Sequence, residues 1–95
     1  MKTLSIVVAT AALLLSNAAI AIDGHDWRAA SAVNRLKEVQ RILDNIRSKG
    51  CVVKLSPEYY VRQLDDLYAS KSTLSLQTFQ AVALVATGAG EVWKC

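Results

Sequence analysis

The sequence predicts an all-α fold, a small three- to four-helix bundle with one disulfide, following an N-terminal signal peptide. Three observations lead to this prediction. Apolar residues recur at helical spacing in the body of the chain, two cysteines are present in the whole sequence, and residues 1–21 have the composition of an export signal.

The export signal begins with the positive charge of Lys2. An apolar run from Leu4 to Leu15 follows, and Ala19-Ile20-Ala21 offers the small-x-small pattern that a signal peptidase cleaves. We therefore expect residues 1–21 to be a signal peptide and residues 22–95 to be a single helical domain. The predicted location is outside the cytoplasm, either in the periplasm or in the medium.

A membrane anchor is the alternative interpretation of this segment, since a spanning helix needs about 20 apolar residues. Ser16 and Asn17 fall late in the stretch, and the next charges downstream are the acids Asp23 and Asp26. These features favour cleavage, so no stable membrane insertion is expected afterwards. No cysteine lies near the cleavage site, which excludes a lipoprotein.

The charge balance argues against a nucleic-acid-binding protein. The chain carries 11 Lys and Arg against 8 Asp and Glu, a formal net charge of +3, and cleavage of the signal removes only Lys2 from this count. The basic residues do not cluster with aromatic residues, as a nucleic-acid surface requires. A domain of this size buries only about 60% of its unfolded surface, so a covalent cross-link would add much of its stability.

Cys51 and Cys95 are expected to form that cross-link, because an exported small domain with two cysteines usually contains one disulfide. Two alternatives stay open at this stage. Both thiols could be free, or the terminal Cys95 could pair with a second chain.

The first predicted helix runs from Trp27 to Ser48. Asp26 is its expected N-cap, and Gly50 is placed to end it in a left-handed conformation. The apolar stripe that defines this helix consists of Ala29, Ala32, Leu36, Val39, Leu43 and Ile46, widened by Val33 and Ile42. After it, residues 51–55 are short, rich in β-branched side chains and predicted to be extended.

The second predicted helix runs from Pro57 to Ala69. Ser56-Pro57-Glu58 supplies a capping hydroxyl, a proline at the first helical position and an acid in the first turn. The third runs from Leu76 to Thr87 with Ser75 as its cap, and a short fourth helix around Glu91 is a further expectation.

The third predicted helix is apolar almost all round. Such a helix is either central in its fold or paired with another surface, and at about twelve residues it is too short to cross a bilayer. A homodimer formed through this helix is therefore a further prediction.

Two resemblances to known proteins follow from short motifs. Gly24-x-x-Trp27 before a helix, Leu64-Asp65-Asp66-Leu67-Tyr68 before a loop, and the Ala-rich run 81–86 resemble small exported bacterial helical proteins of unassigned function. Cys51 before a helix and the ending Trp93-Lys94-Cys95 resemble periplasmic immunity proteins of the Rap1a/Tai type. The second family has Gly-Tyr-x-x-Gly where this chain has residues 35–39. That resemblance implies a small helical protein that neutralises a cell-wall-cutting toxin.

The candidate partner contacts are Tyr59, Arg62, Asp66 and Trp27. Tyr59 lies off the main apolar stripe of its helix, and Arg62 and Asp66 lie on the outer side of the same helix. His25 is the one histidine. If cleavage followed Ile22, the new terminus Asp23-Gly24-His25 could bind Cu(II) or Ni(II) in a square-planar site; cleavage after Ala21 puts histidine fourth, so no metal site is predicted.

No nucleophile–base pair can be assembled from these residues, so an enzyme is not expected and no cofactor is predicted. The predicted function is binding of another protein, with an immunity or inhibitor role as its most concrete form. A periplasmic stress chaperone of the small disulfide-containing helical type is the alternative.

Overall fold

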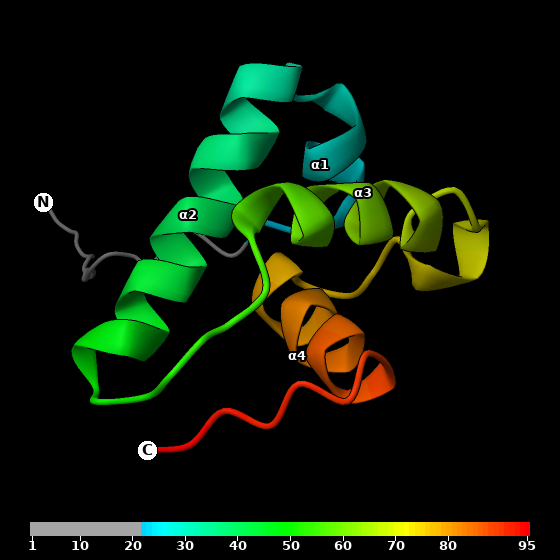
Figure 1. Ribbon diagram of the computed structural model, residues 1–95. Helices are drawn as coiled ribbons and strands as arrows, with labels where there is room; N and C mark the ends of the chain where they lie inside the picture. The colour runs from blue at the N-terminus through cyan, green and yellow to red at the C-terminus, as the bar shows by residue number, and fades with distance from the viewer. Residues whose placement is uncertain (1–21) are drawn as a thin grey trace, which may run out of the picture.

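The computed structural model describes residues 22–95, so the predicted signal peptide lies outside the described part. Within it the chain forms four α-helices and one 3-10 turn (Figure 1). The helices are α1 (Gly24–Ala29), α2 (Ala32–Ser48), α3 (Pro57–Leu67) and α4 (Thr78–Gly88), and the turn is Lys71–Thr73. Extended pairing in residues 22–95 is limited to two isolated bridges, which confirms the all-α prediction.

The first predicted helix is in fact two helices. Ala30 and Ser31 both have extended backbone angles, and the Ser31 hydroxyl caps α2 by accepting the N–H of Asn34 at 3.2 Å. Asp23, not Asp26, caps α1, and Asp26 completes a capping box with it. The break between α1 and α2 places the Trp27 side chain in the core. The predicted apolar stripe of one continuous helix was therefore wrong at its start, where Ala29, Ala32 and Val33 are exposed.

The start of α3 matches the sequence-based prediction. The Ser56 hydroxyl accepts the N–H of Tyr59 at 3.2 Å, and Pro57 occupies the first turn. The helix ends at Leu67, two residues before the predicted end, and the Thr73 hydroxyl then donates to the carbonyl of Ser70 at 2.8 Å.

The start of α4 differs from the prediction, because its N-cap is Gln77 instead of Ser75. Gln77 forms an antiparallel bridge with Asp23, and the N–H of Thr78 donates to the carbonyl of Ile22 at 2.8 Å. The beginning of the described chain is therefore bonded to the first turn of the last helix. This long-range pairing sets where α4 begins.

The core lies where α2, α3 and α4 pack on one another, with α1 closing one end. One buried polar side chain, Thr78, donates its hydroxyl to Glu38 at 2.7 Å. The buried hydrophobic residues are Trp27, Val39, Ile42, Leu43, Ile46, Tyr60, Leu64, Tyr68, Leu74, Ala81, Val82 and Ala86. α4 packs against α3 and α2 and lies below α3 in the view of Figure 1. The side chains of Phe79 and Leu84 on α4 are exposed.

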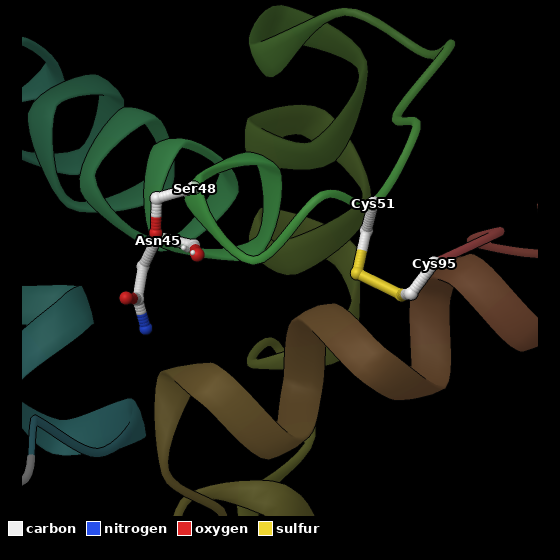
Figure 2. Close-up of a disulfide and its surroundings, with 4 residues drawn as sticks. All are labelled: Asn45, Ser48, Cys51 and Cys95. Atoms are coloured by element: carbon white, nitrogen blue, oxygen red, sulfur yellow. Dashed lines mark hydrogen bonds between the residues drawn. A yellow bond between two sulfur atoms is a disulfide. The ribbon is translucent and has the colours of Figure 1, made fainter.

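The C-terminal tail is extended, so the expected short helix around Glu91 was wrong. Gly90 adopts φ +73°, a left-handed conformation that ends α4, and residues 91–95 then run back toward the segment that follows α2 (Figure 1). Cys95 forms a disulfide with Cys51 of the same chain (Figure 2). The free-thiol and interchain alternatives are thereby excluded in this structure.

Candidate binding groove at the disulfide

Two extended segments meet next to the disulfide. Residues 51–55 follow α2, residues 91–95 form the tail, and the N–H of Val52 donates to the carbonyl of Lys94 at 2.9 Å in an antiparallel bridge. Figure 2 shows the disulfide joining the end of the tail to the segment after α2. The disulfide therefore holds the two segments side by side.

Side chains alternate in both segments, as period-two backbone geometry requires. Val52 and Lys54 point to solvent between the half-buried Cys51, Val53 and Leu55. In the tail, Val92 and Lys94 are exposed, while Glu91 and Trp93 are half-buried. Trp93 packs against the core, so the tail returns to the bundle through this residue.

A groove of about 530 Å³ lies between these segments and the end of α4. Its lining is mainly apolar, and Val92 and Val52 remain 75% and 53% exposed. The complete lining is Val52, Lys54, Leu55, Ala89, Gly90, Glu91, Val92 and Lys94. Its volume falls within the range of about 300–1,000 Å³ that is typical of ligand pockets. We call this feature the disulfide groove.

Glu91 ties the walls of the disulfide groove to the bundle. Its carboxylate accepts hydrogen bonds from the Tyr60 hydroxyl of α3, from the N–H of Lys54, and from the N–H of Leu55 at 3.0 Å. Burial by itself would raise the pKa of Glu91, but these donors outweigh it and lower the pKa below its ordinary value of 4.5. Glu91 is therefore ionised at neutral pH, with its carboxylate oxygens hydrogen-bonded to groups of the fold.

Acid is expected to weaken this attachment. Because the folded-state pKa of Glu91 is lowered, its contribution to the free energy of unfolding is present above the unfolded-state value of about 4.5 and is lost as the pH falls below it. Glu91→Gln should cost about 1–3 kcal/mol at neutral pH and flatten the pH dependence of stability in this acid range. Denaturant unfolding across pH measures both effects. Glu58→Gln, which changes an exposed acid of α3, is the control; an equal loss in both variants would contradict the assignment.

Lys54 and Lys94 supply positive charge at the rim of the groove. Neither lysine takes part in the ion pairs found within residues 22–95, which join His25–Asp23, Arg35–Asp65, Arg41–Glu38 and Arg47–Asp44. The groove surface therefore carries these two ammonium groups together with the Glu91 carboxylate, which also lines it.

Trp27 does not form part of an exposed surface, contrary to the sequence-based expectation of a partner contact. It is 2% exposed and tilts against Tyr68, with the ring centroids 6.1 Å apart. Its Nε1 donates to Asp65 at 2.9 Å, and Asp65 also accepts from Arg35 at 3.2 Å. The guanidinium of Arg35 further donates to the carbonyls of Trp27 and Arg28, at 2.9 and 3.1 Å, across the break before α2. These groups hold α1, α2 and α3 together.

The other predicted contacts lie along α3. Arg62 and Asp66 are exposed, one helical turn apart, as the spacing of four predicts. Tyr59 is half-buried and meets Tyr60 edge-to-face at 5.9 Å, so it offers only part of its ring. These residues share an outer helix surface, but none of them lines the disulfide groove.

His25 lies in the first turn of α1. Its Nδ1 is 3.4 Å from a carboxylate oxygen of Asp23, and its side chain is 68% exposed. No group of three His, Cys, Asp or Glu residues within residues 22–95 is arranged to hold a metal ion. The structure thus pairs His25 with the residue that caps its own helix.

Sequence reasoning missed the groove residues Val52, Lys54, Val92 and Lys94. The signal that could have found them is the same Val-x-Lys pattern in both segments, each next to a cysteine. With the cysteines paired, two such segments must lie close together and present alternate side chains to one side.

Comparison with known proteins returns no match to a family model, to a curated protein or to a solved structure. Within residues 22–95, none of the helices combines the length and hydropathy needed to cross a bilayer.

Proposed function

We propose that this chain is exported, that residues 1–21 are removed, and that the remaining protein acts by binding another protein through the disulfide groove. The observation that carries the proposal is the apolar groove with Val52 and Val92 exposed at its rim. Exposed apolar side chains gathered around a concavity are typical of an interaction site.

The placement of the polar groups supports a binding role over catalysis. Glu91 is bonded to Tyr60 and to backbone N–H groups, and Asp65 is bonded to Trp27 and Arg35. These side chains join elements of the fold. A reacting group needs a base or acid within hydrogen-bond reach and open access to substrate, and these carboxylates already have structural partners.

An immunity or inhibitor protein is the most concrete form of this function. Lys94, from the Trp93-Lys94-Cys95 ending that resembles periplasmic immunity proteins, lines the groove. A toxin that acts in the same exported compartment would be the partner. Cells that express this chain should then survive a toxin encoded beside it.

A stress chaperone is the second candidate, and the Glu91 contacts favour it. Protonation of Glu91 would weaken the attachment of the tail to Tyr60 and Leu55, which would expose more apolar surface in acid. Suppression of light scattering by an unfolding client at low pH, which is absent at neutral pH, would support this candidate over the inhibitor.

Affinity capture from the exported fraction tests the binding proposal. Val92→Asp places a carboxylate in the groove and should abolish capture of the partner protein. The reason is that binding would desolvate this carboxylate against apolar side chains of the partner. Val33→Asp is the matched control: Val33 is 63% exposed and lies in the first turn of α2, whereas the groove follows its last turn, roughly 20 Å away. Equal capture by all three proteins, or by none, would contradict a binding role of the groove.

A further inference from the structure

The outer face of α4 carries exposed apolar side chains and no charge. Residues 78–88 contain no Lys, Arg, Asp or Glu, whereas the exposed sides of α2 and α3 carry charged residues such as Arg47 and Arg62. Phe79 and Leu84 are each 53% exposed. They are five residues apart, so their side chains leave the helix about 140° from each other. The two side chains therefore border opposite edges of the outer face.

An open pocket of about 330 Å³ lies at the C-terminal end of α4. Ala83 and Thr87 line it and follow Phe79 at positions i+4 and i+8, so the exposed ring and the pocket lie on the same side of the helix. Val92 and Trp93 of the tail also line it. We call this concavity the α4 pocket. An exposed ring is thus followed, about two helical turns further on, by a mainly apolar hollow.

The polar side chains of the α4 pocket already have partners. The Thr87 hydroxyl donates to the carbonyl of Ala83 at 2.9 Å. The Glu91 carboxylate accepts hydrogen bonds from the Tyr60 hydroxyl and from the N–H of Leu55. Covering a polar group is costly mainly when it lacks a hydrogen-bond partner. An apolar ring can therefore enter the α4 pocket without depriving these groups of their partners.

A second copy of α4 matches this arrangement of ring and pocket. When two copies pack antiparallel about a two-fold axis at Ala83, Phe79 of each copy lies across from Thr87 of the other. Each ring then meets the α4 pocket of the other copy, as the self-complementary contact of a two-fold dimer requires. The small Ala83 side chain lets the helix axes approach to about 8 Å. Residues near the axis meet their own copies, and the uncharged α4 avoids like-charge repulsion there.

We propose that the chain forms a symmetric antiparallel homodimer through α4, in which the Phe79 ring of each copy occupies the α4 pocket of the other. The 11 residues of α4 span roughly 16 Å. A helix pair of this length buries less than the roughly 1,200 Å² of total surface at which stable interfaces begin. The dimer is therefore weak and reversible. This inference goes beyond the proposed function, since it concerns a second copy of the chain and a different surface.

Sedimentation of the oxidised protein from the exported fraction, at rising concentration, tests the proposal. The natural sequence should show a monomer–dimer equilibrium with a dissociation constant of roughly 10–500 μM, as a small interface gives. Phe79→Asp should weaken the dimer by roughly tenfold or more, because its carboxylate would be desolvated in the α4 pocket. The variant should still fold, since Phe79 is more than half exposed.

Leu84→Asp is the matched control. It adds the same charge to an equally exposed position of α4, about 140° around the helix from Phe79. Its carboxylate stays in solvent, so the dissociation constant should change by less than about threefold at physiological salt. Equal weakening by the two substitutions would overturn the proposal, because it would show general apolar association of α4.

Isotope-filtered NMR on an equal mixture of labelled and unlabelled natural protein locates the contact. Ring protons of Phe79 in one copy should give intermolecular NOEs to the methyl groups of Thr87 and Val92 in the other. Intermolecular NOEs confined to other elements would overturn the proposal. A protein that stays monomeric up to about 1 mM would do the same.

The homodimer and the disulfide-groove function fail separately. Phe79 does not line the disulfide groove, although Glu91 and Val92 line both features. If the protein captures another protein but is monomeric, the dimer is wrong and the groove function stands. If it dimerises but its capture is insensitive to Val92→Asp, the groove function is wrong and the dimer stands.

Discussion

Removal of the disulfide by Cys51→Ser/Cys95→Ser is expected to lower the free energy of unfolding by about 4 kcal/mol. The bond closes a loop with a sequence separation of 44, and loop-closure entropy gives this magnitude for a loop of that length. Cys95 is exposed and Cys51 only half-buried, so little packing is lost besides the bond. For a small domain this is a large part of the net stability. Denaturant unfolding at neutral pH measures it.

The same variant should lose the disulfide groove before the bundle unfolds. The covalent bond holds the end of the tail against residues 51–55, where the remaining links are the Val52–Lys94 hydrogen bond and the Glu91 contacts. Hydrogen exchange should therefore accelerate at Val52 and Leu55. Reduction of the natural sequence is the control and should give the same exchange pattern. Unchanged exchange together with a stability loss below about 1 kcal/mol would contradict this role.

Gly24→Ala is expected to destabilise the fold by about 1–3 kcal/mol, although alanine is the better helix former. A Cβ at this position would lie 2.4 Å from Cδ1 of Tyr68 and 2.8 Å from the Cα of Leu74. Tyr68 cannot easily move, because its hydroxyl donates to the carbonyl of Leu76 at 2.7 Å and its ring packs on Trp27. The N–H of Gly24 also donates to the carbonyl of Leu74 at 3.0 Å, which holds the backbones close. Thermal or denaturant unfolding measures the change.

Gly88→Ala is the matched control for this substitution. Gly88 lies in the last turn of α4, and an added Cβ would meet nothing within 4 Å. Its stability should be unchanged or higher by up to about 1 kcal/mol, the helix-propensity gain of alanine. Similar destabilisation of both variants would show that the close approach of Gly24 to Tyr68 is not the cause.

Local signals in the sequence predicted much of the fold. The Ser56-Pro57 start of α3 needs only a hydroxyl that reaches the next turn and a ring with a suitable φ, and both are visible in the sequence. The left-handed stop that the sequence predicted after the second helix of the structure, α2, occurs at Gly50, which has φ +88°. α4 ends in the same way at Gly90, which has φ +73°.

Long-range contacts decided the features that sequence reasoning missed. The apolar spacing does not indicate that Ala30 and Ser31 are extended. This break between α1 and α2 is stabilised by the Arg35 guanidinium, which donates to backbone carbonyls at the end of α1. The start of α4 depends on Ile22 and Asp23, more than 50 residues earlier in the chain. Periodicity describes one helix at a time and cannot report such pairings.

The sequence predicted the disulfide beside the candidate site, but not the residues that line the groove. Sequence reasoning predicted aromatic residues as partner contacts. Trp27 is instead buried in the core, where its Nε1 donates a hydrogen bond to Asp65. Val52 and Val92 lie far apart in sequence, and each alone is an ordinary exposed valine. They become one surface only after the Cys51–Cys95 pairing brings their segments together.

Site-specific photocrosslinking in living cells tests the central claim most directly. A photoreactive amino acid at Val92, on the rim of the disulfide groove, should trap a discrete protein adduct, whereas the same group at Val33 should trap none. Adducts at Val33 with none at Val92, or the same adducts at both positions, would contradict a partner-binding role of the groove.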